Sequence, residues 1–222
     1  MNHHPTVRLF GRSSSHFTRV AAMFACELGI THQRIPLHDM NSRDRFDYGG
    51  NPALKLPALQ VDGAMLFGAE NICRRLAELG HAQRIVWPEE LKSNPARNAQ
   101  ELIWHSMSAQ VQIVMGTRIA KLPIENVFFD KLLEGFRNSL AWLDEHWPHI
   151  HESLPSPRDV SLLEVTLFCL VEHLRFRSTV SLEPYENLRA FTATYGQRSS
   201  AQRTPFQFDT PGVPHVTEAP RS

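Results

Sequence analysis

The chain contains Leu56-Pro57-Ala58-Leu59-Gln60-Val61-Asp62-Gly63-Ala64-Met65-Leu66-Phe67, a stretch that sets the architecture of its first half. Two apolar runs are separated by Asp62-Gly63, and Asp-Gly between apolar runs favours a tight turn between antiparallel strands. We therefore predict a β-hairpin here. The residues that follow, 70–79, have helical spacing, and Gly80 is placed to end that helix.

Upstream of the hairpin, the pattern predicts a strand, a helix and a second strand. The strand covers residues 7–10, the helix 17–28, and the second strand 34–37, which Pro36 marks as an edge strand. Two strands joined by a helix lie parallel through a right-handed crossover. The first half is therefore predicted to be an α/β domain of order βαβ-ββα, a small mixed sheet with helices packed on it.

After residues 87–90 the strand signals stop, which predicts an all-α second half. Asn94 resembles an N-cap before Pro95, and the helix it begins extends to Lys121. A second helix is predicted over residues 125–147, where Pro148 would stop it. Another is predicted over residues 185–198.

One segment of the second half is ambiguous because residues 165–171 are β-branched and aromatic, as in a strand. Ser161 and Glu164 have the spacing of a capping box, in which each side chain accepts from the other's backbone N–H. We therefore predict a helix from Ser161, buried because it is apolar almost all round. The predicted domains are 1–86, a linker 87–94, a helical domain 95–209 and a loose tail 210–222.

The composition argues against several classes of protein. The 222 residues include 23 Lys and Arg against 23 Asp and Glu, so the formal charge is zero, which argues against nucleic acid as a partner. No run approaches a membrane span, and residues 1–5 do not resemble a signal peptide, so we expect a cytoplasmic protein. The three cysteines, Cys26, Cys73 and Cys169, are dispersed, which predicts buried thiols and no metal site.

The first candidate for chemistry is the serine-rich segment 11–19, at the start of the predicted first helix. A hydroxyl at a helix N-terminus can help to hold an anion such as a thiolate. Ser14 or Ser15 could instead only cap the helix, and the residues alone leave both interpretations open.

Two further candidates lie in the hairpin region. A cis Leu56–Pro57 bond would turn the Leu56 backbone into a cleft, although trans is the commoner form. At the start of the next helix, free N–H groups could bind a carboxylate and Glu70 could bind an ammonium group. Glu70 could equally do no more than complement the helix dipole.

In this order and spacing, the motifs resemble those of the cytosolic glutathione transferase (GST) superfamily, over roughly residues 7–206. The resemblance rests on five segments: Gly11-Arg12-x-x-Ser15 running into Glu27-Leu28-Gly29, Asn51-Pro52-x-x-Lys55-Leu56-Pro57-x-Leu59, Glu70-Asn71, Ser161-x-x-Glu164 and Tyr185-Glu186-Asn187-Leu188. It implies a thioredoxin-like N-terminal domain, an all-α C-terminal domain and, as in most members, a homodimer.

The resemblance also implies a glutathione site. Ser15 would face the sulfur, with Ser13 and Ser14 as rivals. The remaining roles would be divided as follows: the Leu56 backbone pairs with the cysteinyl amide beside cis-Pro57, Glu70 binds the γ-glutamyl ammonium, Asn71 its carboxylate and Lys55 the glycine carboxylate. A second-substrate pocket between the domains would involve Trp104, His105, Ser108 and Met115.

The function implied is transfer of the glutathione thiolate, as co-substrate, to a small hydrophobic electrophile. Two departures stand out: Asn71 replaces the family's serine, and the first loop lacks a tyrosine or cysteine. They keep open a non-catalytic binding or regulatory protein on the same fold. A glutathione-dependent isomerase or lyase is a further alternative. No metal and no membrane partner is implied.

Overall fold

A computed structural model describes residues 5–81, 83–211 and 215–217. The contacts divide the chain into two compact units. The first unit comprises Met1–Gln83 together with Gln197–Ser222, and the second comprises Arg84–Gly196. The first unit is therefore built from both ends of the chain.

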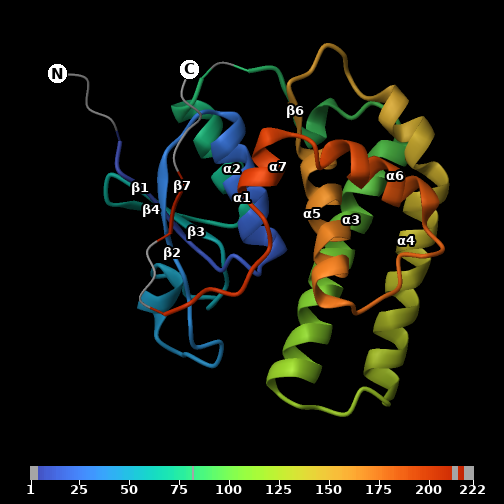
Figure 1. The fold of residues 1–222 in the computed structure, drawn as a ribbon, viewed down its shortest axis with the longest axis horizontal. Helices are drawn as coiled ribbons and strands as arrows, with labels where there is room; N and C mark the ends of the chain where they lie inside the picture. The colour runs from blue at the N-terminus through green and yellow to red at the C-terminus, as the bar shows by residue number, and fades with distance from the viewer. Residues whose placement is uncertain (1–4, 82, 212–214, 218–222) are drawn as a thin grey trace. The chain divides into compact units, whose positions relative to one another are not determined.

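The first unit contains a five-stranded mixed sheet of order β4-β3-β1-β2-β7 (Figure 1). The strands are β1 (Val7–Phe10), β2 (His32–Ile35), β3 (Ala58–Val61), β4 (Ala64–Phe67) and β7 (His215–Thr217). β1 and β2 are parallel and β3 and β4 antiparallel, as predicted. Asp62 and Gly63 form the turn with φ of 47° and 90°, so the hairpin prediction is confirmed.

The prediction that the second strand lies at an edge is wrong. β2 ends at Ile35, so Pro36 falls just after the strand and removes no ladder hydrogen bond. The outer side of β2 pairs antiparallel with β7. An interior place in the sheet is possible for β2 because its proline lies outside the paired residues.

Two helices, α1 (His16–Glu27) and α2 (Ala69–Leu79), pack against each other and against the sheet (Figure 1). The helix α7 (Ser199–Arg203) packs on α1. Apolar side chains from the centre of α1, among them Val20, Met23 and Phe24, are fully buried and form the core of this unit with Leu9 and Leu59. A short 3-10 turn, Arg45–Tyr48, precedes β3.

The second unit is built from helices, as predicted. They are α3 (Asn94–Ile113), α4 (Val127–Ser153), α5 (Leu162–Arg177) and α6 (Glu186–Tyr195). α3 continues into a π-helical turn, Val114–Ile119, and a 3-10 turn covers Pro88–Glu90. A two-residue parallel bridge, β5 (Ile85–Val86) with β6 (Val160–Ser161), connects the start of the unit to α5. Within the described residues, no helix is long and apolar enough to cross a bilayer.

Two predicted helix ends in this unit are wrong. The N-cap of α3 is Ser93, whose Oγ accepts from the Ala96 N–H at 3.3 Å, and not Asn94. α4 continues through Pro148 to Ser153. A proline offers no N–H to the carbonyl four residues earlier, that of Asp144. That carbonyl accepts instead from Asn187 Nδ2 at 3.0 Å, which compensates for the missing bond.

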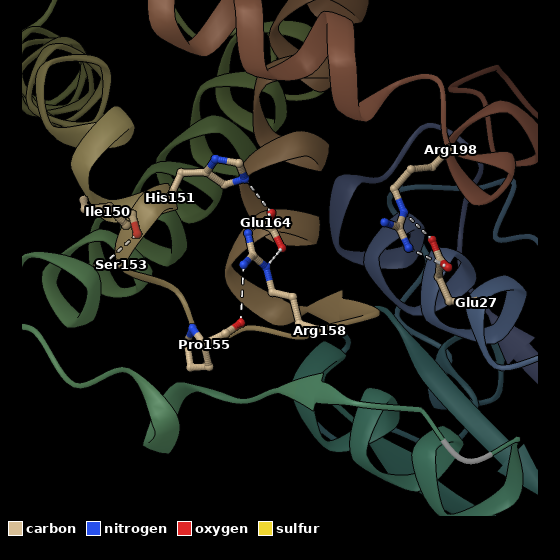
Figure 2. A network of polar contacts seen from close by, with 8 residues as sticks. All are labelled: Glu27, Ile150, His151, Ser153, Pro155, Arg158, Glu164 and Arg198. Carbon is tan, nitrogen blue, oxygen red and sulfur yellow. Dashed lines mark hydrogen bonds and ion pairs between the residues drawn. The ribbon is translucent and has the colours of Figure 1, made fainter.

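α5 is helical and buried, as predicted, but the capping box at its start does not form. Ser161 occupies the N-cap without a side-chain hydrogen bond, and its buried Oγ has no partner among the described residues. Glu164 accepts instead from Arg158 Nε and His151 Nε2, each at 2.9 Å (Figure 2). Burial alone would raise the Glu164 pKa, but these hydrogen bonds outweigh burial and lower it. A paired, buried carboxylate has replaced the predicted cap.

The C-terminal region also differs from the predicted domains. The single helix predicted over residues 185–198 is α6 alone, and a second helix, α7, follows it. Residues 197–209, assigned from sequence to the helical domain, pack with the first unit. The predicted loose tail, 210–222, contains β7. Residues 212–214 and 218–222 lie outside the described residues.

Candidate functional site

The sheet register brings the three candidate segments to the same end of the sheet. Phe10, the last residue of β1, pairs with Ala58, and Ala58 pairs with Phe67 at the end of β4. The serine-rich loop follows Phe10, Pro57 precedes Ala58, and Gly68 follows Phe67 directly. The loop, the Leu56–Pro57 bond and the start of α2 are therefore neighbours because of strand pairing alone.

The first loop, residues 11–15, is held closely to the sheet. The Gly11 N–H donates to the Ile35 carbonyl at 3.0 Å. A Cβ on Gly11 would lie 2.4 Å from Oγ1 of Thr18, so only glycine fits at this point. The loop ends at Ser15, whose Oγ caps α1 by accepting from the Thr18 N–H at 3.3 Å.

The three serines of this loop have different surroundings. Ser15 is partly exposed, and Ser13 and Ser14 are buried. The Ser13 N–H donates to Asp209 Oδ2 at 3.0 Å, and the Ser13 hydroxyl donates to Asp209 Oδ1. The proton of the Ser13 hydroxyl is thus committed to a carboxylate, whereas the Ser15 oxygen acts as an acceptor in its cap.

The Leu56–Pro57 peptide bond is cis. Asn51 holds the preceding turn, because its Nδ2 donates to the Lys55 carbonyl at 2.8 Å and its Oδ1 accepts from the Ala53 N–H at 3.0 Å. Leu56 is partly exposed and the Lys55 side chain is exposed. The cis bond is the feature that the family resemblance implied at this position.

The start of α2 is bound to the same segment, since the Gly68 N–H donates to the Pro57 carbonyl at 3.3 Å. Gly68 is the N-cap, with φ of 89°, and offers no side-chain acceptor to the first-turn N–H groups. Glu70 forms an ion pair with Arg74 at 2.8 Å. Asn71 Nδ2 donates to the Phe67 carbonyl at 3.1 Å.

The residues predicted for the second substrate lie in the second unit. Trp104, His105 and Ser108 are on α3, with Trp104 half-buried and the other two exposed. Met115 lies in the π-helical turn that continues α3 and is partly buried. All four come from one continuous helical segment.

Two residues near the first loop were missed by sequence reasoning. Asp209 is 196 residues from Ser13 in the chain, and no pattern links them. Arg34, on β2, is half-buried: burial lowers its pKa, and the nearby Asp209 carboxylate raises it. No local pattern in the sequence distinguished Arg34 from the other arginines of the first half.

Cys26, Cys73 and Cys169 are free thiols and all buried, as predicted. Burial raises the pKa of the Cys26 thiol, with Arg203 opposing the shift. In the part of the chain that the structure describes, no group of three or more His, Cys, Asp or Glu residues could hold a metal ion.

Comparison with known proteins identifies the class of fold. Residues 14–79 match the family model described as "Glutathione S-transferase, N-terminal domain". This stretch contains Ser14 and Ser15, the Leu56–Pro57 bond, Glu70 and Asn71, which are most of the candidate residues. No curated protein matches the chain.

Solved structures extend the similarity to the whole fold. A glutathione transferase from Methylobacillus flagellatus with glutathione bound is 20% identical, with a TM-score of 0.67 over 90% of this chain and 99% of that one. A family member from Pseudomonas fluorescens Pf-5, also with bound glutathione, is 21% identical, with a TM-score of 0.72 over 90% and 98%. A Populus trichocarpa glutathione transferase is 13% identical, with a TM-score of 0.63 over 90% and 97%.

Residues 14–79 thus match a glutathione transferase N-terminal domain model, and the chain has the two-domain fold of these solved glutathione transferases. The fold is therefore the one that the sequence resemblance implied.

Proposed function

We propose that the protein is a glutathione transferase that activates the glutathione thiol for attack on a small hydrophobic electrophile. In the reaction, the sulfur forms a bond to an electrophilic carbon, and either a leaving group departs with its electron pair or the adduct takes up a proton. The main support for this proposal is an arrangement at one end of the sheet. The first loop, the cis Leu56–Pro57 bond and the uncapped start of α2 lie together there.

Ser15 is the proposed thiolate donor. A serine hydroxyl has two acceptor lone pairs and one proton, so accepting from the Thr18 N–H leaves the proton available for the sulfur. Capping and thiolate stabilisation are therefore compatible, and the dipole of α1 favours the anion as well. Ser13 is the weaker candidate because its proton is given to Asp209.

The remaining contacts are proposed by family resemblance and by fit. The Leu56 backbone would pair with the cysteinyl amide, and Lys55, an exposed cation, would reach the glycine carboxylate. Glu70 would bind the ammonium group, because a carboxylate accepts several hydrogen bonds and retains capacity beside Arg74. Asn71 is held by Phe67, so the uncapped N–H groups of α2 would bind the γ-glutamyl carboxylate.

The proposal extends to the electrophile, the assembly and the location. Trp104, His105, Ser108 and Met115 would contact the electrophile, with Trp104 and Met115 supplying apolar surface. A homodimer in the cytoplasm follows from the resemblance. Glutathione is a co-substrate, and no metal takes part.

A non-catalytic protein with the glutathione transferase fold is the second candidate. Two observations favour it. The Asn71 side-chain amide donates to the Phe67 carbonyl, and the Asp209 carboxylate is hydrogen-bonded to Ser13 in the first loop. This alternative predicts glutathione binding without turnover of any electrophile.

The test uses a matched pair of helix caps. Ser15→Ala and Ser93→Ala each remove one N-cap hydrogen bond of 3.3 Å, so each should cost about 1 kcal/mol of stability. Only Ser15→Ala should slow conjugation of a chromogenic electrophile, by about 10- to 100-fold in kcat. Glutathione affinity should fall by less, about threefold, because the peptide contacts remain.

Thermal melting decides between binding and no binding. Glutathione at ten times its Kd should stabilise the chain by about 1.4 kcal/mol. No melting shift at millimolar glutathione would refute the proposal. A shift without turnover of an electrophile panel would favour the non-catalytic alternative, and equal activity of Ser15→Ala and Ser93→Ala would remove Ser15 from the chemistry.

A further inference from the structure

A short C-terminal segment, residues 206–211, folds back onto the first loop, and we call it the C-terminal arm. Its Asp209 carboxylate takes both hydrogen-bond donors of Ser13, the backbone N–H at 3.0 Å and the hydroxyl. Ser13 is only 4% exposed, and its partner Asp209 is partly exposed. The loop that the proposed function assigns to an anion is therefore already in contact with one.

The arm is anchored on both sides of this contact. Before it, the buried Arg19 guanidinium lies 4.4 Å from the centre of the Phe206 ring and donates to the Ala201 carbonyl at 3.1 Å. After it, β7 pairs with β2 and is the outermost strand of the sheet. Contacts before and after Asp209 therefore hold the C-terminal arm in the position that brings Asp209 to Ser13.

The negative charge of Asp209 also has a positive partner, Arg34. Arg34 on β2 is close enough to Asp209 for the carboxylate to act on its ionisation. Ser13 and Arg34 together supply two hydrogen-bond donors and a positive charge for a single anion. With Asp209 in place, this positive charge is balanced and both donors are used.

A thiolate at Ser15 would be a second anion two residues away along the loop. Like charges in a partly buried site disfavour each other's ionised form. When Asp209 is on Ser13, its charge opposes the formation of a thiolate at Ser15. When the arm leaves, the donors of Ser13 and the charge of Arg34 become available.

We propose that Asp209 is an internal occupant of the anion-binding first loop and competes with the glutathione thiolate, so that the arm must leave Ser13 before glutathione binds at full strength. The arm is then an autoinhibitory element, and apparent affinity is reduced by the fraction of chains with the arm in place. This inference rests on the proposed function, since it concerns the same loop and ligand.

The test compares Asp209→Asn and Asp209→Ala with Asp62→Asn in the full-length chain. Asp62 is a matched control because it too accepts from a backbone N–H, that of Thr6, but lies in the hairpin turn at the other end of β3. Glutathione and S-methylglutathione, which has no ionisable thiol, are titrated by calorimetry. Thiolate formation on the bound glutathione is followed by ultraviolet absorbance against pH.

Competition predicts that both Asp209 variants bind glutathione about three- to tenfold more tightly than the wild type, and S-methylglutathione with a smaller gain. The pKa of the bound thiol should fall by about half a unit or more in Asp209→Asn. Asp62→Asn should match the wild type in both. In the wild type, glutathione should speed hydrogen exchange in residues 206–211, because the arm is displaced.

Several results would overturn the competition. Wild-type affinity and thiol pKa in both Asp209 variants would remove Asp209 as a competitor while leaving the proposed function standing. Slower exchange of the arm on adding glutathione would show that it closes over the ligand instead. If neither the Asp209 variants nor the wild type bind glutathione, both proposals fail. Melting curves matched to Asp62→Asn establish that the variants are folded.

Discussion

His32 is a residue whose charge the fold controls strongly. It lies on β2 at 2% exposure, with Nδ1 3.5 Å from the Ile30 carbonyl. Burial lowers its pKa to about 4, the Ile30 carbonyl opposes the shift, and the charge of Arg34 adds to it. The imidazole is therefore neutral in the folded protein at physiological pH.

This burial predicts a specific acid sensitivity. The unfolded chain takes up a proton at His32 near pH 6.5, whereas the folded chain resists it down to about pH 4. Unfolding is thus increasingly favoured as pH falls between these values, by on the order of 3 kcal/mol in total. Replacing His32 by Gln should remove this part of the pH dependence, measured by urea unfolding between pH 7 and 4.5. The exposed His38, changed to Gln, is the control and should retain it; an unchanged slope in His32→Gln would contradict the prediction.

Local sequence rules predict some of the roles of individual residues and not others. The helix boundary at Ser15 and the Asp62–Gly63 turn follow from local rules, and the structure has both. Local rules could not rank Ser13, Ser14 and Ser15, because the distinction comes from Asp209 in a distant segment. Likewise the capping box at Ser161 does not form, because Glu164 accepts hydrogen bonds from Arg158 and His151 instead. Local rules could not predict these contacts, because they depend on tertiary packing.

At the scale of elements, Pro148 shows how a local rule is overridden. It leaves the Asp144 carbonyl of α4 without its intrahelical donor, and Asn187 at the start of α6 donates to that carbonyl. The Asp144 carboxylate also accepts from the Leu188 N–H at 2.9 Å. One residue of α4 thus satisfies two donors of α6, and the proline that should have ended α4 helps to fasten α6 to it.

A double-mutant cycle tests this attachment. Asn187→Ala should cost about 1–2 kcal/mol, because it leaves a carbonyl without a donor. In a Pro148→Ala background, the restored Ala N–H supplies that carbonyl, so the same change should cost about 0.5–1 kcal/mol less. Urea unfolding of the four chains measures the coupling. Strictly additive effects would mean that Asn187 and Pro148 act independently.

At the scale of the whole molecule, the chain closes on itself within the first unit. Glu27, at the end of α1, accepts from Arg198 Nε at 2.8 Å and from Nη2 at 2.9 Å, just before α7 (Figure 2). The Ser200 hydroxyl donates to the same carboxylate. A sequence-based boundary placed this region in the helical domain because a short polar helix has no pattern that shows where it packs. In the structure, the Glu27 carboxylate, whose side chain is 14% exposed, and Arg19, which donates to the Ala201 carbonyl, hold this region to α1.

The Glu27–Arg198 pair links the end of α1 to the residue before α7, and its loss should weaken the first unit. Arg198→Met removes the bidentate pair and leaves a largely buried carboxylate with Ser200, so the free energy of unfolding should fall by about 1–3 kcal/mol. The control is Arg75→Met, which breaks the exposed pair with Glu78 on α2 and should change stability by less than about 0.5 kcal/mol. Because α7 leads directly into the C-terminal arm, hydrogen exchange in Arg198→Met should also rise at residues 199–211 and at Ser13, while α5 in the other unit keeps its protection. Equal stability losses in the two variants, or unchanged exchange at Ser13, would show that the arm holds the first loop without help from the Glu27–Arg198 pair.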